Sequence, residues 1–212
     1  MLFEMAHIGS SARGFLLAGG KSSRMGAGVD KAFLEFRGQS LLDRALGVLS
    51  AVCGSVRIVG DPSRFSIYEA TSYGPVVADI FSGCGPLGGI HAALVSSPAE
   101  LNLMLAVDMP FVSHQLLAFL LATAASGEHA ATMTVPRIGR GLQPLCAVYR
   151  REFATVAESA LRARNYKVDA AFSGLPMRVI EAAELSAAGF SGRNFFNLNT
   201  PDDCRVAECG EI

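Results

Sequence analysis

A glycine-rich stretch near the N-terminus has residue types that could hold a phosphate. Residues 16–31 read LLAGGKSSRMGAGVDK, with four glycines and the three cationic side chains Lys21, Arg24 and Lys31. Glycines let main-chain N–H groups approach an anion closely, and the cations could neutralise a triphosphate. The alternative is a solvated, charged surface loop that follows a core strand.

Two common phosphate-binding motifs do not fit this stretch. Gly20-Lys21-Ser22 matches the end of the P-loop pattern, but the first glycine of that pattern would stand at position 15, which is Phe15. A dinucleotide-binding motif that starts at Gly26 would need a glycine at position 31, which is Lys31. Both the ATPase and the NAD-binding hypotheses are weakened by these misfits.

Two aspartates follow other apolar segments. Asp79 comes after residues 76–78, and Asp108 comes after the nearly continuous apolar run 101–107. Asp108 is suited to Mg²⁺, which takes one or two carboxylates together with phosphate oxygens and water. The alternative for each aspartate is a turn residue that caps the backbone at the end of a strand.

Strand and helix patterns alternate along the chain. We expect strands at residues 14–18, 55–60, 76–78, 101–107, 130–135, 142–149 and 195–198. We expect helices at 41–52 with Ser40 as the cap, at 85–94, from 113, at 150–164, and from 201 with Thr200 as the cap. This alternation predicts an α/β fold, a three-layer, Rossmann-like domain with a mostly parallel sheet flanked by helices. Ligands bind beyond the carboxyl ends of such strands, so the glycine loop, Asp79 and Asp108 should converge.

Length and composition favour one compact domain. The chain has 212 residues, of which 50% are hydrophobic and 17% charged, and its formal net charge is −1. That charge gives no general attraction to nucleic acid or to a membrane surface. The five cysteines form no CxxC pair and suggest reduced thiols in a cytoplasmic protein. We expect residues 1–12 to be a flexible tail and residues 13–212 to form a single domain.

Five segments, taken in order, resemble one enzyme family. LAGGKSSRMG, followed by Asp30-Lys31, closely resembles the signature L-A-G-G-x-S-x-R-M-G-x-x-K of molybdenum cofactor guanylyltransferases. The other four are VAD before GPLGG (77–89), AVDMPF (106–111), QPLCAVY (143–149) and NLNTP (197–201). The resemblance implies a nucleotidyltransferase domain over residues 13–212 with a glycosyltransferase-A-like fold.

The same resemblance implies an activity and its partners. Members of the family transfer GMP from GTP to the terminal phosphate of molybdopterin and release pyrophosphate. GTP and molybdopterin, or the molybdenum cofactor, are therefore the expected substrates, and Mg²⁺ is the expected metal, with Mn²⁺ as the alternative. Transient contact with molybdenum-insertion and acceptor proteins is also expected, and nucleic acid and membranes are not.

The family's functional positions can be carried over residue by residue. The resemblance implies that Lys31, Arg24 and Asp108 are catalytic and that Asp108 binds the metal. The expected nucleotide-binding residues are Leu17, Ala18, Gly19, Gly20, Lys31, Asp79, Gly85, Pro86, Leu87, Gly88 and Asp108. Asn197 and Asn199 are expected on the metal or pterin side; their alternative role is packing in a turn before Thr200.

Two further sequence features bear on specificity. Gly19 favours guanine, because the related cytidylyltransferases resemble L-A-A-G at this point. Gly60 departs from the family, which commonly has a polar side chain there to touch the nucleotide. Two other hypotheses are a cytidylyltransferase that acts on molybdopterin or another small phosphate, and a non-catalytic GTP-binding module. The second would predict loss of Lys31 or Asp108, and both are present.

Overall fold

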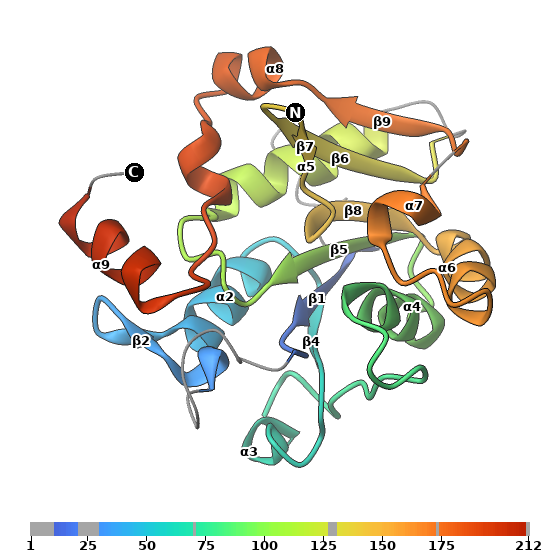
Figure 1. Ribbon diagram of the computed structural model, residues 1–212, viewed down its shortest axis with the longest axis horizontal. Coiled ribbons are helices and arrows are strands. Elements are labelled where there is room, and N and C mark those ends of the chain that lie inside the picture. Colours follow the sequence, from blue (N-terminus) through green and yellow to red (C-terminus); the bar gives the residue numbers. More distant parts are fainter. Residues whose placement is uncertain (1–10, 21–29, 70, 127–130, 173, 211–212) are drawn as a thin grey trace.

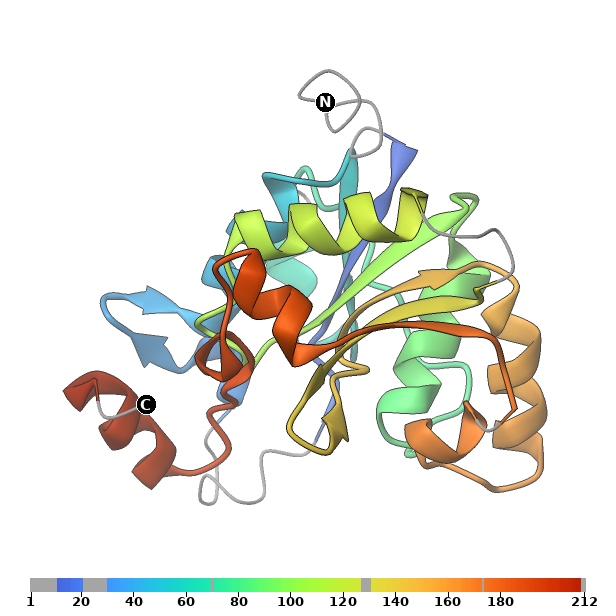
Figure 2. The same ribbon diagram turned by 90° about the horizontal axis from the view of Figure 1, so that it is seen from above.

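The structure is a computed structural model that describes residues 11–20, 30–69, 71–126, 131–172 and 174–210. A central sheet lies between two layers of helices (Figures 1 and 2). Most of the predicted tail, 1–12, falls outside the described residues. Ala12 is buried, and its carbonyl oxygen accepts a hydrogen bond from the N–H of Gly54.

Within the described residues the central sheet has seven strands in the order β4-β1-β5-β8-β6-β7, and β9 also pairs with β6. They are β1 (Arg13–Leu17), β4 (Ser55–Val59), β5 (Leu101–Ala106), β6 (Met133–Ile138), β7 (Gly141–Leu142), β8 (Cys146–Arg150) and β9 (Met177–Ile180). β1 is parallel to β4 and β5, and β6 is parallel to β9, whereas β8 is antiparallel to both β5 and β6. The predicted α/β fold is confirmed, with a mixed sheet because β8 is reversed.

Helices cover both faces of this sheet. The helices are α2 (Leu41–Ser50), α3 (Ser66–Glu69), α4 (Pro86–Ser96), α5 (His114–Ser126), α6 (Phe153–Arg162), α7 (Val168–Ala171), α8 (Ala182–Ala187) and α9 (Pro201–Cys209), with the 3-10 turns η1 (Lys31–Phe33) and η2 (Gly192–Phe195). α2 and α5 lie on one face, and α4 and α6 on the other (Figure 2). Successive side chains of β1 point to opposite faces of the sheet. Leu16 packs in the hydrophobic cluster that contains Leu46 of α2, and Phe15 packs in the cluster that contains Ile90 of α4.

The start and end of α2 show how the sequence sets the packing. Ser40 caps the helix by accepting a hydrogen bond from the N–H of Asp43 at 3.0 Å, as predicted. Near the other end, a Cβ built on Gly14 of β1 would lie 3.2 Å from both Cys53 Sγ and Leu49 Cδ2. Glycine at position 14 therefore lets the end of α2 approach the sheet closely.

Three predicted strands are not found as continuous strands. The segment predicted at 76–78 forms only an isolated bridge, in which Val77 pairs with Val59 at the end of β4. The strand predicted at 142–149 is interrupted at residues 143–145, where Pro144 has no N–H to donate to a ladder. The strand predicted at 195–198 is wrong. Asn194 accepts a hydrogen bond from the N–H of Ser191 and donates one to the carbonyl of Phe111, which closes η2. The chain then crosses the end of β5 instead of joining a sheet edge.

The short hairpin of β2 (Glu35–Phe36) and β3 (Gln39–Ser40) was not predicted. Its turn is Arg37-Gly38, and both residues have positive φ values, 52° and 76°. Two-residue hairpin turns of type I′ need positive φ at both central residues. Strands of two residues are too short to give an alternating pattern, so the sequence carried little signal for them.

Candidate active site

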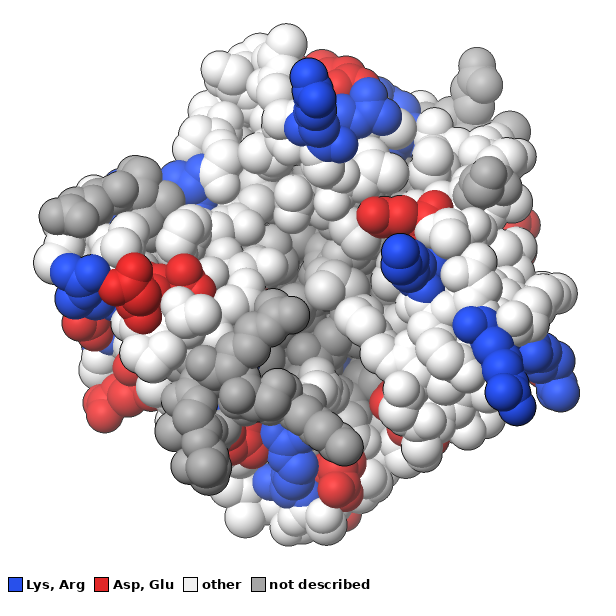
Figure 3. Space-filling view, in the orientation of Figure 1, with Lys and Arg blue, Asp and Glu red and all other residues white. Residues whose placement is uncertain are grey.

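The carboxyl ends of β1, β4 and β5 lie together, and backbone hydrogen bonds hold the segments that follow them. The N–H of Ala18 donates to Val59 O at 2.9 Å, and the N–H of Val107 donates to Leu17 O at 3.2 Å. The N–H of Gly60 donates to Val77 O at 3.0 Å, which brings in the segment that leads to Asp79. This face is hollowed near its centre, and its charged side chains lie mostly around the periphery (Figure 3).

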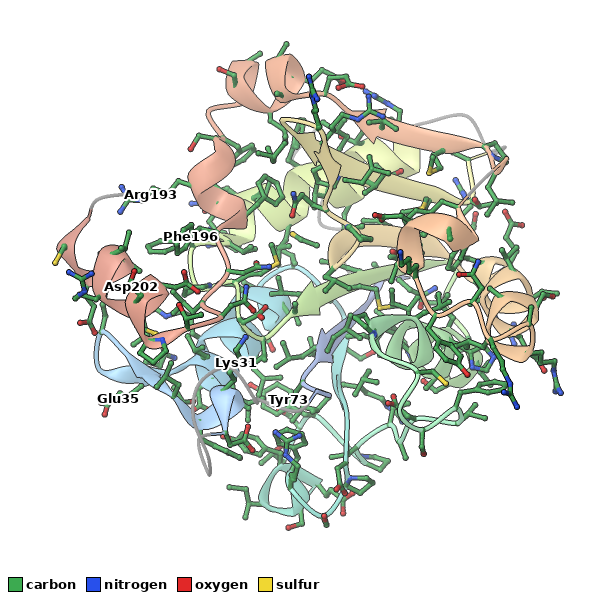
Figure 4. All side chains as sticks on the ribbon, in the orientation of Figure 1. Lys31, Glu35, Tyr73, Arg193, Phe196 and Asp202 are labelled. Atoms are coloured by element: carbon green, nitrogen blue, oxygen red, sulfur yellow. The ribbon has the colours of Figure 1, made fainter. Side chains whose placement is uncertain are left out.

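Lys31 is the centre of a polar cluster at this edge. Its Nζ donates to Asp108 Oδ2 at 3.1 Å and to Asn199 Oδ1 at 2.7 Å. The side chains of Lys31 and Asp108 are only 17% and 19% exposed, so their ion pair is partly shielded from water. Figure 4 shows Lys31 close to the chain that enters α9. Three of the predicted residues, from distant parts of the sequence, thus meet directly.

A cap at the start of α9 holds the asparagine segment in place. The N–H groups of Asn199 and Thr200 donate to Asp203 Oδ2 at 2.8 and 2.7 Å, and the N–H of Leu198 donates to Asp108 O at 2.8 Å. Burial raises the pKa of Asp203, but the hydrogen bonds that it accepts outweigh burial and leave its pKa below the usual value. The link of Asp203 to Asn199 was not predicted from the sequence.

Two oxygen atoms at the site have no hydrogen-bond partner within the described residues. They are Oδ1 of Asp108 and Oδ1 of Asn197, and both are buried. Buried polar atoms of folded proteins are nearly always paired, so an unpaired oxygen needs an explanation. Carboxylate and amide oxygens are hard ligands of the kind that Mg²⁺ prefers.

Asp79 and the start of α4 form another part of the edge. Asp79 is half-buried, and burial raises the pKa of its carboxyl group. A Cβ built on Gly89 would lie 3.7 Å from Asp79 Oδ1, which places Asp79 against the first turns of α4. That helix begins with Gly85 as the cap and Pro86 at its first position, followed by the buried residues Leu87 and Gly88.

The glycine loop is described only at its start. Leu17 and Ala18 are buried, whereas Gly19 and Gly20 are exposed. Gly20 has a φ of 131°, which residues with a side chain rarely adopt. Arg24, predicted to be catalytic, lies outside the described residues together with the rest of 21–29.

Comparison with known proteins identifies the family. The model of the MobA-like NTP transferase domain matches residues 14–175. The chain belongs to this family. It is 36% identical over 192 residues to the "Probable molybdenum cofactor guanylyltransferase" of Pelotomaculum thermopropionicum, covering 91% of this chain and 89% of that protein. The predicted enzyme class, nucleotidyltransferase, is confirmed.

Solved structures agree with this assignment. Molybdopterin-guanine dinucleotide biosynthesis protein A from Archaeoglobus fulgidus matches with a TM-score of 0.80 and 25% identity, covering 94% of this chain and all (100%) of that one. Rv0371C from Mycobacterium tuberculosis, a complex with manganese, shares the fold with a TM-score of 0.65 at 16% identity, covering 95% of this chain and 100% of that one. Members of this MobA-like family are typically metal-dependent.

The space around Gly60 explains why this position has no side chain. A Cβ built on Gly60 would lie 2.9 Å from Cε2 of Phe65, a ring that is fully buried. Real Cβ atoms essentially never come this close to another heavy atom, so a polar side chain at position 60 would have to displace the ring. The Phe65 ring therefore accounts for glycine at position 60, where the family commonly has a polar residue. The sequence alone did not reveal this contact.

Proposed function

We propose that the chain transfers GMP from GTP to the phosphate of molybdopterin or the molybdenum cofactor, which gives the guanine dinucleotide cofactor and pyrophosphate. The observation that carries the proposal is the contact of Lys31 Nζ with Asp108 and Asn199. In family terms these residues are the glycine-loop lysine, the strand-end aspartate and the second asparagine of N-x-N-T-P. Kinship with a guanylyltransferase at 36% identity over 91% of the chain adds to it.

The nucleotide would lie across the ends of β1 and β4. The main chain of Leu17 to Gly20 would face the base and the phosphates, and the lack of a Cβ at Gly19 would leave room for the exocyclic amine of guanine. Asp79 would accept hydrogen bonds from guanine N1 and N2. The start of α4, Gly85 to Gly88, would face an anion or a base edge. Pro86 has no N–H and that of Gly88 donates to Gly85 O at 3.1 Å, so the N–H groups of Gly85 and Leu87 would make this contact.

Lys31 would act on the reacting phosphorus. An oxygen of the acceptor phosphate forms the new bond to the α-phosphorus of GTP, and the bond from that phosphorus to the β-phosphate oxygen breaks. The acceptor oxygen is already ionised at neutral pH, so the step needs no strong general base. It needs cations that offset the negative charges as the two groups approach. Lys31 would supply one such charge, and Arg24 is proposed to stabilise the leaving pyrophosphate.

The residues present fit a divalent metal ion. Asp108 Oδ1 and Asn197 Oδ1 are buried oxygens without hydrogen-bond partners among the described residues, and Asn199 offers a third oxygen. The described parts of the chain contain no group of three or more His, Cys, Asp or Glu that could hold a metal. We therefore propose Mg²⁺, or Mn²⁺, which binds few protein groups and completes its shell with water and phosphate oxygens. When bound, it would neutralise phosphate charge.

The asparagine segment would face the acceptor. The N–H of Leu198 donates to Asp108 O, and this bond holds the flanking residues Asn197 and Asn199 beside Asp108. Their side-chain amides are suited to orient either the metal or the phosphate of the pterin. We further propose transient contact with molybdenum-insertion and acceptor proteins, and a cytoplasmic location. Among the described residues, no helix combines the length and apolar character needed to cross a bilayer.

The test is to offer the protein GTP, CTP and ATP separately, with Mg²⁺ and molybdopterin or its molybdenum form. We expect pyrophosphate release and the dinucleotide product with GTP alone. Product with CTP would instead identify a cytidylyltransferase, and GTP binding without pyrophosphate release would identify a non-catalytic module. An isothermal titration with GTP and CTP separates binding selectivity from turnover.

A further inference from the structure

Asp30 precedes Lys31 in the chain and has no role in the function proposed above. Its carboxylate makes two kinds of contact. Oδ1 accepts a hydrogen bond from the N–H of Ala32 at 3.1 Å and so caps the turn η1 that begins with Lys31. The same carboxylate accepts Arg64 Nε at 3.0 Å on Oδ2 and Arg64 Nη2 at 2.5 Å on Oδ1. Arg64 thus holds Asp30 through two parallel hydrogen bonds, the most directional arrangement available to these groups.

Arg64 is itself held by contacts within its own segment. Its Cζ lies 5.1 Å from the centroid of the Phe65 ring, and its N–H donates to Asp61 O at 3.1 Å. Phe65 is fully buried, and its ring centroid is 5.8 Å from that of Phe33 in η1. The segment after β4 therefore supports η1 twice, through the Arg64–Asp30 ion pair and through the two rings.

The turn η1 needs such support, because it is too short to fix its own orientation. It consists of three residues, and its internal bonds are those of Phe33 N–H to Asp30 O and Leu34 N–H to Lys31 O, both 3.1 Å. A single turn of 3-10 helix has weak hydrogen-bond geometry. The direction in which Lys31 leaves the turn is thus set by the groups that hold the flanking residues.

We infer that Asp30 and Arg64 are positioning residues that aim the ammonium group of Lys31 at the reacting phosphate. The inference rests on the role proposed for Lys31. It does not depend on guanine or on the identity of the acceptor, because any nucleotidyl transfer would use the same ammonium group. Asp30 and Arg64 are 30% and 29% exposed, and Asp30 caps the turn that begins with Lys31, so the pair can act through Lys31 without touching the substrate.

The expected effect follows from the cost of misplacing a catalytic group. A displacement of about 1 Å can cost about 10²-fold in rate. The ring contact and the Asp30 cap remain when Arg64 is replaced by methionine, so the displacement should be smaller. We expect kcat to fall about tenfold in Arg64→Met, with the KM for the nucleotide changed less than about twofold. Arg64→Lys should recover part of the loss, because an ammonium group replaces the fork with a single point contact.

A double-mutant cycle tests whether Arg64 acts through Lys31. The variants are Arg64→Met, Lys31→Ala and the double variant, assayed by pyrophosphate release with whichever nucleotide the wild-type chain consumes. Arg162→Met is the matched control, since Arg162 also donates Nε and Nη2 to a carboxylate, that of Glu158, and also lies over a ring, that of Phe81. It should retain the wild-type rate. Failure of the proposed function would appear separately, as a wild-type chain that consumes another nucleotide or none.

We expect Arg64→Met to lower kcat about tenfold when Lys31 is present and less than about twofold when Lys31 is alanine, because groups that act as a unit are not additive. An equal loss in both backgrounds, or no loss in either, would overturn the inference. A crystal structure of Arg64→Met gives a readout that needs no activity. Lys31 Nζ should leave hydrogen-bonding distance of Asp108 or Asn199, and an unchanged position would also overturn it.

Discussion

Replacing Asp108 by asparagine separates the catalytic role proposed for this carboxylate from its structural contribution. The variant keeps the shape of the side chain and an oxygen or nitrogen at each position, but it removes the negative charge that faces Lys31 at 3.1 Å. The pair is 17% and 19% exposed, between an exposed pair, worth at most about 1 kcal/mol, and a fully buried one, whose breakage costs about 3–5 kcal/mol. We therefore expect the free energy of unfolding to fall by about 1–2 kcal/mol.

The effect on turnover should be larger. Loss of the charge that would anchor the metal should remove at least about 3 kcal/mol of transition-state stabilisation, or about 10²-fold in kcat. Because an amide oxygen remains a weak ligand, the Mg²⁺ concentration for half-maximal rate should rise, and added Mg²⁺ should restore part of the activity.

Steady-state kinetics across a Mg²⁺ series, with a thermal melt followed by circular dichroism, measures both quantities. Asp79→Asn is the companion variant, since it also removes a half-buried carboxylate, and it should alter the affinity for GTP with little change in Mg²⁺ dependence. If Asp108→Asn keeps both the wild-type kcat and the wild-type Mg²⁺ dependence, Asp108 does not hold the metal.

Three other predictions concern Lys31, Gly60 and His91. Lys31→Ala should lower kcat about 10²-fold while the Kd for GTP rises only modestly. Lys31→Arg should recover part of the rate. If both variants keep turnover within about twofold of wild type, Lys31 is only a solvated surface charge. Gly60→Asn should lower the free energy of unfolding by about 1–3 kcal/mol, because its Cβ would lie 2.9 Å from the Phe65 ring. A denaturant titration measures this loss, which should be smaller in a Phe65→Leu background. His91 is 2% exposed, and burial lowers its pKa from the ordinary value of 6.5, so the unfolded chain binds more protons in the window below that value. Stability should thus decrease as pH falls below 6.5, and unfolding curves of His91→Leu should lack this part of the decrease.

The order of the elements was readable from the sequence because long apolar runs dominate it. β1, β5, α2 and α4 were predicted to within a few residues. β1 and β5 are nearly continuous apolar runs, α2 repeats its apolar residues at helical spacing, and α4 begins at a Gly-Pro pair. The strand predicted at 195–198 failed for the opposite reason. Its apolar residues Phe195 and Leu198 are buried in the core, but the polar contacts of Asn194 with Ser191 and Phe111 fix the backbone in a 3-10 turn.

The contacts inside the site could be predicted only in part. The resemblance named Lys31, Asp108 and Asn199, but their hydrogen bonds join positions 77 and 168 residues apart, which no local pattern encodes. The Arg64–Asp30 pair and the ring beside Gly60 were missed altogether. The first joins residues 34 positions apart, and the second forms inside the segment after β4, where Asp61-Pro62-Ser63 reads as an ordinary polar turn.

The bond between Lys31 and Asn199 also bears on how the protein acquires activity during synthesis. The matched family model ends at residue 175, yet Lys31 takes one of its hydrogen-bond acceptors from residue 199. A ribosome that releases residues in order exposes the glycine loop well before the asparagine segment. The lysine can therefore gain the Asn199 acceptor only after a further 168 residues have been made, later than the strands that would face the nucleotide. Chains that stop between residues 175 and 199 would retain β1, β4 and β5 and lack the asparagine segment, so the proposed site would be incomplete in them.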